Sequence, residues 1–357
     1  MRLCEALAAR GHDVTLLCRS ENAREVRAVP GVRTVPLERR RGLLGGRRGY
    51  VRQVRRALTG GVDVVHVHGL ARMAWWLRDA RSRRGAPLVL TAHSADELGP
   101  SGSPAGTGGA RRARRHVAQV REILARADLV TGPSRWFAAR LRDAGAARVA
   151  VVGWGPSEDG LATVPARPFL EDGVFRILVL ARLVEAKGVP VLLEGFARAF
   201  AGDPTGRLVV AGDGPQRGAI EARARALGLA DRVELTGFVE GDRLRRVLEG
   251  ADVVAVPTLG DYETFSCAAL DGSAAGRALV VADGGALPER VEAGEGILAH
   301  AGDAEAWARA LRALREDGAR TAALGAAGRA TAGGQTWDRV AQNLETLYAG
   351  SARGSRA

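Results

Sequence analysis

Several features are scarce in this 357-residue chain, and each scarcity excludes a class of protein. The three cysteines, Cys4, Cys18 and Cys267, lie far apart without a CxxC pair, which argues against a disulfide scaffold or a zinc ribbon and favours a reducing cytoplasm. No apolar run approaches the ~18 residues of a membrane-spanning helix, and we expect no signal peptide. Since 46% of the residues are apolar, enough for two cores, the sequence predicts a soluble cytoplasmic protein of two domains.

Lysine is almost absent: of 52 basic residues, 51 are arginine and one is Lys187. Residues 1–160 hold 29 arginines and 14 acidic residues, whereas residues 161–357 hold 23 basic and 26 acidic residues. Arg52, Arg55 and Arg56 share one predicted helix, and more arginines lie at 39–41, 47, 48 and within 111–115. The basic half predicts an anionic partner, such as a membrane surface, although a general preference for arginine explains it equally well.

Apolar strand-like runs alternate with helical stretches along the chain. The runs lie at 14–18, 62–67, 87–91, 129–131, 149–152, 175–180, 207–211, 232–235, 252–257 and 278–282. Helices are expected between most of them, including 50–58, 71–84, 110–126 and 134–144. This alternation predicts parallel sheets covered by helices on both faces, the doubly wound α/β class.

A stretch with three prolines and few aliphatic residues interrupts the alternation, and we interpret it as a linker over residues 156–173. It separates a Rossmann-like N-terminal domain at 1–155 from a C-terminal domain at 174–335. A final helix at 336–350 is expected to pack back towards the N-terminal domain, and residues 351–357 are expected to form a disordered tail. Two such domains face a central ligand cleft with the carboxyl ends of their strands.

The segment from Ala181 to Gly188 follows a buried strand and precedes a helix. A loop in this place directs backbone N–H groups and the positive end of a helix dipole towards an anion. Arg182 can bind phosphate oxygens in a forked geometry, and Lys187 can supply a compact second charge. A surface loop with two solvated cations is the alternative, but Lys187 is kept as lysine in a chain that otherwise uses arginine.

Three further strand ends carry glycines or carboxylates. Gly212 and Gly214 lie in a G-x-G-x-x-x-G run, for which a tight turn is the simpler explanation. Glu263 and Asp271 are eight residues apart after another strand, where they either bind sugar or ribose hydroxyls or do acid–base work, or belong to a solvated helix face. Gly284 and Gly285 follow a fourth strand and let the backbone approach a ligand closely.

The N-terminal domain offers histidines at strand ends. His93 follows the strand at 87–91 and is expected at the cleft, whereas His66 and His68 share one strand face and fit strand-end packing better than a metal site. The sequence contains no nucleophile elbow, Walker loop, H-E-x-x-H or D-x-D motif. We therefore expect no metal and no cofactor.

Six motifs, in order, resemble the retaining GT-B glycosyltransferases of the group-1 family (family 4), which use nucleotide-sugar donors. They are Arg182-x4-Lys187-Gly188, Val210 to Pro215, Val233 to Val239, Ala251 to Pro257, Glu263-x7-Asp271 and Gly284-Gly-x3-Glu289. The resemblance is strongest from Val174 to Gly302 and looser in the first domain. It implies a GT-B fold with a nucleotide-sugar-binding C-terminal domain and an acceptor-side N-terminal domain.

The resemblance also implies roles for individual residues. Arg182 and Lys187 would hold the donor diphosphate and stabilise the leaving nucleotide. Glu263 would hold the transferred sugar together with the backbone of Phe265, Ser266 and Cys267. Asp271 would bind the ribose hydroxyls, and His93 would lie near the reacting sugar. The turn with Gly212 and Gly214 belongs to the donor site, and Gly237, Phe238 and Val239 would border the base.

The chain departs from the family pattern at several points. The family usually has Glu where this chain has Asp271, and Gly where it has Ser266. Its inter-domain Asn-Gly-Val-Asp turn is replaced by Trp154-Gly-Pro-Ser157. The sequence opens within a helix, so the N-terminal domain is expected to lack its first strand and to have a gap in its sheet; we expect the functional chain to be longer.

The sequence therefore predicts a hexosyltransferase that uses a UDP- or GDP-sugar with retention. A sugar-nucleotide 2-epimerase of the same fold and a catalytically degenerate protein that binds an anionic partner are the alternatives. The sequence does not identify the acceptor, for which a lipid-linked molecule and a small-molecule aglycone are the two candidates. Peripheral contact with the anionic inner face of the membrane is a further hypothesis, and nucleic acid is not an expected partner.

Overall fold

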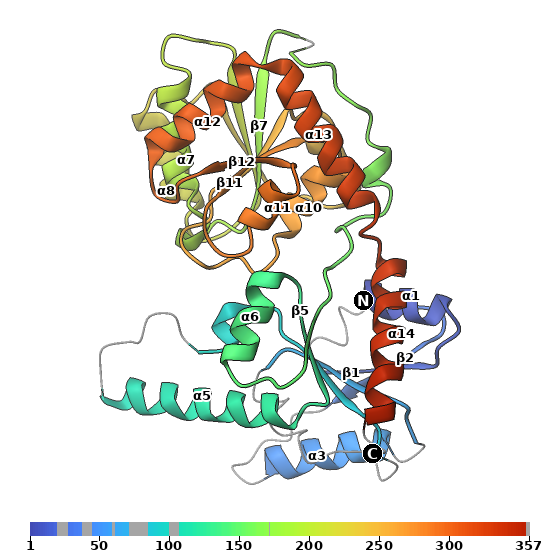
Figure 1. Ribbon diagram of the computed structural model, residues 1–357. Helices are drawn as coiled ribbons and strands as arrows, with labels where there is room; N and C mark the ends of the chain where they lie inside the picture. Colours follow the sequence, from blue (N-terminus) through green and yellow to red (C-terminus); the bar gives the residue numbers. More distant parts are fainter. Residues whose placement is uncertain are drawn as a thin grey trace. The chain divides into compact units, whose positions relative to one another are not determined.

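The computed structural model describes residues 1–19, 28–37, 45–58, 61–70, 85–99, 107–170 and 172–354. The chain forms two units, one made of Met1–Trp154 and Trp337–Ala357, the other of Gly155–Thr336 (Figure 1). The predicted helix at 71–84 and the arginines at 39–41 lie outside the described residues. Within the described part of the chain, no helix combines the length and the apolar character needed to cross a bilayer.

The second unit is built on a six-stranded parallel sheet in the order β12-β11-β10-β7-β8-β9. Its strands are β7 (Phe175–Leu180), β8 (Gly206–Ala211), β9 (Val233–Gly237), β10 (Val253–Val256), β11 (Ala278–Ala282) and β12 (Gly296–Ala299). Since β10 lies on the opposite side of β7 from β8, the strand order reverses between β7 and β10. A parallel sheet opens a crevice at the carboxyl ends of the strands at such a point.

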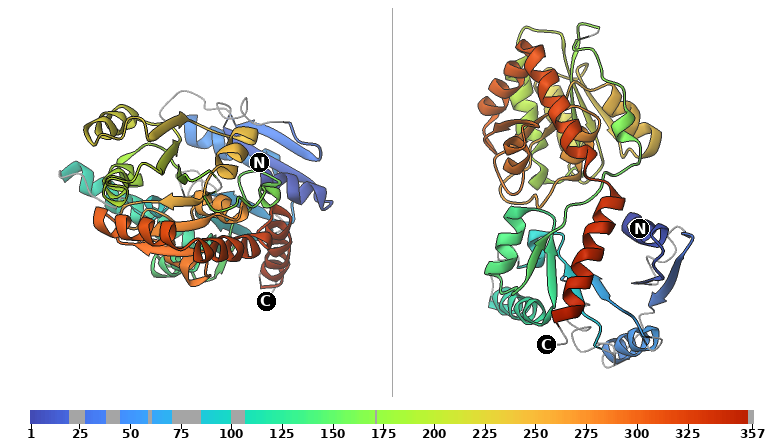
Figure 2. Two further views of the ribbon diagram at one scale, coloured as in Figure 1. Left: turned by 90° about the horizontal axis from the view of Figure 1, so that it is seen from above. Right: turned by 45° about the vertical axis from the view of Figure 1, so that its right-hand side comes forward.

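Helices cover both faces of this sheet (Figures 1 and 2). They are α7 (Val189–Ala199), α8 (Arg217–Ala226), α9 (Gly241–Glu249), α10 (Cys267–Ala274), α11 (Pro288–Glu292), α12 (Ala304–Glu316) and α13 (Gly318–Gly333). Helix α7 contacts α12, and α10 contacts α13. The core between sheet and helices is apolar, with Phe175, Phe196 and Trp307 fully buried, so the loops at the carboxyl ends of the strands rest on a packed base.

The described strands of the first unit form two separate parallel sheets. One contains β1 (Val14–Arg19) and β2 (Val32–Leu37); the other has the order β3-β4-β5-β6, from β3 (Val65–His68), β4 (Leu88–Thr91), β5 (Leu129–Gly132) and β6 (Val149–Val151). Its described helices include α1 (Arg2–Ala9), α3 (Gly45–Ala57), α5 (Thr107–Arg126) and α6 (Arg135–Asp143). The α/β class with parallel sheets is as predicted.

The last helix, α14 (Trp337–Gly354), belongs to the first unit, where it contacts α1 (Figure 2). Its apolar side chains Val340 and Leu344 pack with Val152 at the end of β6. Arg10 donates to Glu345 at 2.7 and 2.9 Å and to Asp338 at 2.9 Å. The predicted disordered tail at 351–357 is wrong for its first four residues: α14 continues to Gly354, and Ser351 is 1% exposed with its hydroxyl bonded to the Leu347 carbonyl. Residues 355–357 lie outside the described residues.

The predicted linker at 156–173 is also wrong, because most of this segment is fastened to the second unit. Arginines of that unit donate to its backbone carbonyls: Arg245 to Gly160, Arg329 to Val164 and Arg277 to Pro165, at 2.7–2.8 Å. A low content of aliphatic residues does not reveal such contacts, since the groups that hold the segment are carbonyl oxygens common to all residues.

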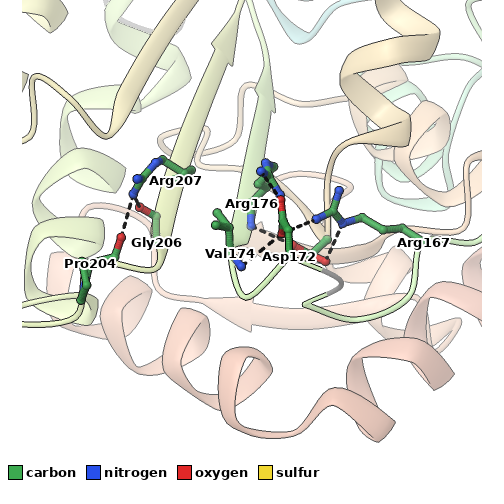
Figure 3. A network of polar contacts seen from close by, with 8 residues as sticks. Arg167, Asp172, Val174, Arg176, Pro204, Gly206 and Arg207 are labelled. Carbon is green, nitrogen blue, oxygen red and sulfur yellow. Dashed lines mark hydrogen bonds and ion pairs between the residues drawn. The ribbon is translucent and has the colours of Figure 1, made fainter.

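The end of this segment is held by charged side chains at the start of β7 (Figure 3). Asp172 accepts hydrogen bonds from Arg167 at 2.8 Å and from Arg176 at 2.5 and 2.9 Å. Arg167 also pairs with the buried Asp252 at 3.4 Å. This network lies at the amino end of β7 and β10, so it braces the sheet at the edge opposite the crevice.

Candidate functional site

The loops at the carboxyl ends of β7 to β11 interlock through their backbones. The Leu183 N–H donates to the Asp213 carbonyl at 2.8 Å, and the Leu259 N–H donates to the Ala186 carbonyl at 2.8 Å. A Cβ added at Gly212 would lie 1.8 Å from the Ala181 oxygen, and one added at Gly188 would lie 2.0 Å from the Pro257 oxygen. These two glycines are therefore required where neighbouring loops touch, which fixes the loops relative to one another.

The other glycines singled out in the sequence also lie where two of these loops are in close contact. A Cβ on Gly214 would lie 2.6 Å from the Leu183 oxygen, and one on Gly284 would lie 2.2 Å from the Gly260 oxygen. At Gly285 the added atom would lie 2.3 Å from the Glu263 oxygen. In this structure the role of Gly212 and Gly214 is close packing of backbone; contact of their loop with a donor stays a prediction.

At the centre of these loops lie three of the predicted residues, Arg182, Lys187 and Glu263. Lys187 Nζ forms an ion pair with Glu263 Oε1, and their side chains are only 16% and 12% exposed. The Thr258 hydroxyl donates to the same Glu263 oxygen at 3.1 Å. Arg182 reaches the group from the exposed side of the β7 loop. Glu263 lies 76 positions after Lys187 in the sequence, yet the fold brings it together with Lys187 and Arg182 at the carboxyl ends of β7 and β10.

Tyr262 completes this group, and sequence reasoning assigned it no role. Its hydroxyl accepts a hydrogen bond from Arg182 Nη2 at 3.0 Å, and its ring centroid lies 5.1 Å from Lys187 Nζ. Its place immediately before Glu263 is the one signal in the sequence that could have pointed to it. Two cations, one carboxylate and one phenol thus converge on a single region of the second unit.

Helix α10 begins beside this group. Ser266 is its N-cap and has the unusual backbone angles φ 67° and ψ 94°, while its hydroxyl accepts from the Ala269 N–H at 3.3 Å. Cys267, the first residue of the helix, is exposed to solvent.

Asp271 lies within α10 and is 3% exposed. Its Oδ1 accepts a hydrogen bond from the Ser157 N–H at 2.8 Å, so the carboxylate holds the backbone at Ser157 against the helix. Its predicted contact with ribose stays a prediction. Glu158, the next residue, accepts from the Gly241 N–H at 3.2 Å, which ties the same segment to the start of α9.

Phe265 is buried against a charged pair. The Arg290 guanidinium carbon lies 5.0 Å from the Phe265 ring centroid, and Arg290 pairs with Glu295 at 3.4 Å. Glu295 also accepts from the Ser273 hydroxyl at 2.5 Å. All four side chains are buried, so the backbone of the Glu263–Ser266 loop rests on a fixed support.

The segment predicted to border a base ends β9. Gly237 has φ +76°, Phe238 is 67% exposed and Val239 is half-buried. Arg217 donates to the Leu235 carbonyl at 3.0 Å and Arg243 donates to the Thr236 carbonyl at 3.1 Å, so two helices brace the strand end. A large exposed ring on a braced backbone is suited to stacking on a flat ligand.

His93 belongs to the first unit, where it joins a cluster at the ends of β3 and β4. Its Nε2 lies 3.1 Å from His68 Nδ1, and its ring lies 5.4 Å from Trp154. His66 bonds Tyr348 through Nδ1 at 2.7 Å and Thr91 through Nε2 at 2.6 Å. Burial lowers the pKa of the half-buried His66 and His93, whereas His68 is exposed at the end of β3. The cluster is therefore neutral near pH 7 and suited to hydroxyl groups rather than anions.

Among the described residues, no group of three or more histidine, cysteine or acidic side chains is arranged to hold a metal ion. The second unit instead offers Arg182 and Lys187, and cations of this kind bind the phosphates of a ligand directly. Beside them, Glu263 offers carboxylate oxygens that accept hydrogen bonds from hydroxyl groups.

Comparison with known families matches both units. Residues 174–317 match the model "Glycosyl transferases group 1", and residues 1–155 match the model "Glycosyl transferase 4-like domain". A D-inositol 3-phosphate glycosyltransferase of Xylanimonas cellulosilytica is 31% identical over 98% of this chain and 90% of its own length. The protein of the same name from Salinispora tropica is 31% identical over 81% of this chain, and the match spans 64% of that relative.

Solved structures share the fold at low sequence identity. Sucrose-phosphate synthase of Thermosynechococcus elongatus has a TM-score of 0.78 and 23% identity, over 97% of this chain and 91% of its own. Anabaena HepE in complex with UDP-glucose has a TM-score of 0.75 and 19% identity, over 98% of this chain and 95% of its own.

Proposed function

Because this chain belongs to the group 1 glycosyltransferases, we propose that it transfers a hexose from a UDP-sugar to a hydroxyl-bearing acceptor with retention of anomeric configuration. The observation that carries the proposal is the convergence of Arg182, Lys187 and Glu263 at the β7–β10 crevice. A diphosphate needs cations, and a hexose needs carboxylate acceptors for its hydroxyl groups. The UDP and UDP-glucose complexes of Anabaena HepE favour UDP over GDP.

In this reaction the bond between the anomeric carbon and the diphosphate oxygen breaks, and negative charge develops on the departing nucleotide. Arg182 and Lys187 would stabilise that charge electrostatically, in a site whose loops are already fixed. The acceptor oxygen forms its bond on the same face, and its proton passes to the departing phosphate oxygen. Glu263 would hold the transferred hexose, and its ion pair with Lys187 would be exchanged for contacts with the donor.

The acceptor side of the proposal rests on the first unit. Its neutral imidazoles, His68 and His93, and the Trp154 ring suit a polyol or sugar ring. The surplus of arginine over acidic residues in residues 1–160 favours an acceptor that carries negative charge. A phosphorylated polyol has both properties, and the relatives named above take their name from D-inositol 3-phosphate.

A donor and acceptor panel tests the proposal. The protein is incubated with UDP- and GDP-linked glucose, galactose, N-acetylglucosamine and mannose, with and without inositol 3-phosphate, and products are identified by mass spectrometry and anomeric NMR. We expect release of UDP from one UDP-sugar and an α-linked product. Failure to hydrolyse or transfer any donor would leave the degenerate alternative, and release of a free 2-epimerised sugar would favour the epimerase, for which the comparisons give no support.

Membrane contact is a separate hypothesis. On α3, Arg52, Arg55 and Arg56 are exposed, whereas Val54 is 1% exposed and faces the unit's interior. Near an anionic bilayer each such arginine contributes about 1 kcal/mol. Co-sedimentation with phosphatidylglycerol vesicles in low and high salt tests it. Binding that is lost with salt and in the triple variant with glutamine at 52, 55 and 56 supports the hypothesis, and no binding in low salt ends it.

A further inference from the structure

Tyr262 contacts both cations of the proposed donor site, Arg182 and Lys187. It stands in the loop between β10 and α10, next to Glu263, and is half-buried. Its hydroxyl accepts from Arg182 Nη2 at 3.0 Å, and Lys187 Nζ lies 5.1 Å from its ring centroid. One neutral side chain thus contacts both cations, which come from a different loop.

The contacts differ in kind from the Lys187–Glu263 ion pair. A carboxylate beside an ammonium group neutralises it and must be displaced, at least in part, before a phosphate can use the charge. A phenol hydroxyl and a ring face hold cations through a dipole and a quadrupole and leave their net charge intact. Tyr262 can therefore fix Arg182 and Lys187 in place while both stay available to an anion.

Fixing them matters because arginine and lysine have the longest and most mobile side chains. Arg182 is exposed, so without a partner it would sample many rotamers, each of which must be given up when a ligand binds. The two cations also repel each other, and the repulsion favours conformations that separate them. A side chain that holds both reduces the cost of bringing them onto one ligand.

We propose that Tyr262 is a positioning residue of the donor site: its hydroxyl orients Arg182 and its ring supports Lys187, so that both cations face one nucleoside diphosphate. The proposal rests on the proposed function, and it adds that diphosphate recognition depends on a residue that itself carries no charge. Arg182 and Lys187 make the contacts to phosphate, and Tyr262 acts through them.

Two substitutions separate the two contacts. Tyr262→Phe removes only the hydroxyl, and we expect it to weaken UDP binding about 10-fold, the usual worth of one hydrogen bond to a charged group. Tyr262→Leu also removes the ring face, and we expect a further loss of about 3-fold or more. Binding of uridine, measured by ligand-detected NMR, should stay within about 2-fold in both, because uridine has no phosphate for the cations to hold.

The matched control is Tyr348→Phe in the first unit. It removes the same atom from a hydroxyl that bonds His66 at 2.7 Å, and UDP affinity should be unchanged. Melting temperatures of all variants report whether each is folded. Steady-state kinetics should show a loss for Tyr262→Phe in both KM and kcat, since charge on the leaving diphosphate is greatest in the transition state.

A double-mutant cycle gives the decisive readout. In an Arg182→Ala background, Tyr262→Phe should have no further effect on UDP affinity, since the hydroxyl has lost the group it orients. An equal loss in both backgrounds, equal losses for UDP and uridine, or no loss at all in Tyr262→Phe would each overturn the proposal. Absence of UDP and GDP binding in the unmodified protein would instead overturn the proposed function, and this inference with it.

Discussion

The second unit joins its six strands in one hydrogen-bonded sheet, whereas the described strands of the first unit form separate sheets of two and four strands. In the second unit, the loops that carry Arg182, Lys187 and Glu263 are locked by backbone hydrogen bonds and by glycines without room for a side chain. At the histidine cluster of the first unit, the Gly69 N–H also donates to the Thr91 carbonyl, at 2.7 Å, but a Cβ added at Gly69 would meet its nearest atom, Glu97 Oε1, only at 3.7 Å. A charged site needs rigid support to act without reorganisation, and the close contacts at Gly188 and Gly212 supply it in the second unit.

The first unit depends more on contacts from distant parts of the chain. Helix α14 returns from the far end of the sequence, and its Glu345 and Tyr348 bind Arg10 and His66. The hydroxyls of Thr91 and Thr131 continue the polar chain from His66 across β4 and β5, 2.6 Å apart. The polar cluster of the first unit contains titratable histidines, whereas the buried Asp252 and Glu295 of the second unit are paired with arginine. The two units should therefore respond differently to mutation and to pH.

We expect the largest effect from substitutions in the charged group of the second unit, which consists of Arg182, Lys187 and Glu263. Glu263→Gln should nearly abolish transfer, and Lys187→Ala should lower kcat/KM by about 10²-fold or more, the usual cost of losing a group that stabilises transition-state charge. Kinetics with the donor found in the panel measure both. Glu194→Gln, on the exposed face of α7, is the matched control and should be silent. Unchanged activity in Lys187→Ala would remove the diphosphate assignment.

Asp271, in α10, offers a sharper comparison with Glu263, in the loop that precedes this helix. It is buried and bonded to the Ser157 N–H, so Asp271→Asn should keep the fold but weaken that bond, with a smaller loss of activity than Glu263→Gln. We expect about 10-fold, mostly in KM, on the basis of one charged hydrogen bond. If kcat instead fell as far as in Glu263→Gln, the division of roles between the two carboxylates would be wrong.

The interlocked loops predict the next largest effect, on stability. Gly188 and Gly202 both have positive φ, +62° and +75°, but an added Cβ meets the Pro257 oxygen only at Gly188. Gly202→Ala should therefore cost about 1 kcal/mol of unfolding free energy from backbone strain. Gly188→Ala should cost about 3 kcal/mol, since overpacking adds to the strain, and should abolish UDP binding. Denaturant titration measures both, and equal costs would contradict the interlocking of the loops.

Acid should weaken the first unit selectively. Burial lowers the pKa of His66 well below its ordinary value, and the charges of His68 and His93 add to this effect. The folded state therefore binds fewer protons than the unfolded state, and stability falls as pH drops below about 6.5, by up to about 1.4 kcal/mol per pH unit for each such histidine. Hydrogen exchange at pH 7.5, 6.5 and 5.5 should show opening of β3 and β4 before β7.

Two variants test the cause of this acid sensitivity. His66→Phe should lower stability at pH 7.5, because Tyr348 and Thr91 lose their partner, but should flatten the decline towards pH 5.5. In the second unit, Asp283 raises the pKa of His300, so that pair adds stability at low pH and loses it as pH rises through the raised pKa. His300→Gln should therefore leave the decline intact. A decline of the same slope in His66→Phe would show that other groups cause it.

The sequence predicted the strands that are formed by continuous apolar runs. It missed β2 and β12, which are not such runs. Strand β2 contains Pro36 and the charged Arg33, and β12 is only four residues long and starts with glycine. Both are held by pairing with a neighbour, β1 and β11, which local pattern does not show. The same limit explains the wrong linker, since the arginines that bind residues 160–165 lie 80 or more positions away.

The charged residues of the site could be predicted from the sequence, but the residues that support them could not. Arg182, Lys187 and Glu263 each follow a strand, and parallel strands end at one edge, so their proximity follows from topology alone. The contacts of Tyr262, the burial of Asp271 and the Arg290–Glu295 pair behind Phe265 depend on how loops pack, which no residue spacing encodes. His93 was placed correctly at a strand end, but its contact with His68 arises from pairing of β3 with β4.

We expect the smallest effect, on the unfolding free energy, from substitutions at one helix N-cap in each unit. Ser266 and Ser134 are both 4% exposed and both accept from a backbone N–H, at 3.3 and 3.1 Å, but Ser266 has φ 67° and Ser134 has φ −146°. Glycine at an N-cap costs a few tenths of a kcal/mol, whereas removing side-chain strain at positive φ returns about 1 kcal/mol.

Ser266→Gly should therefore raise the unfolding free energy by about 0.5 kcal/mol, and Ser134→Gly should lower it by about 0.3 kcal/mol. Alanine removes the cap at both sites and keeps the strain at Ser266, so Ser266→Ala should cost about 1 kcal/mol or more. Thermal unfolding of the four variants, with alanine and glycine at each site, measures the difference. If Ser266→Gly destabilised as Ser134→Gly does, the backbone at the start of α10 would not be strained, and the serine would be there for its hydrogen bond alone.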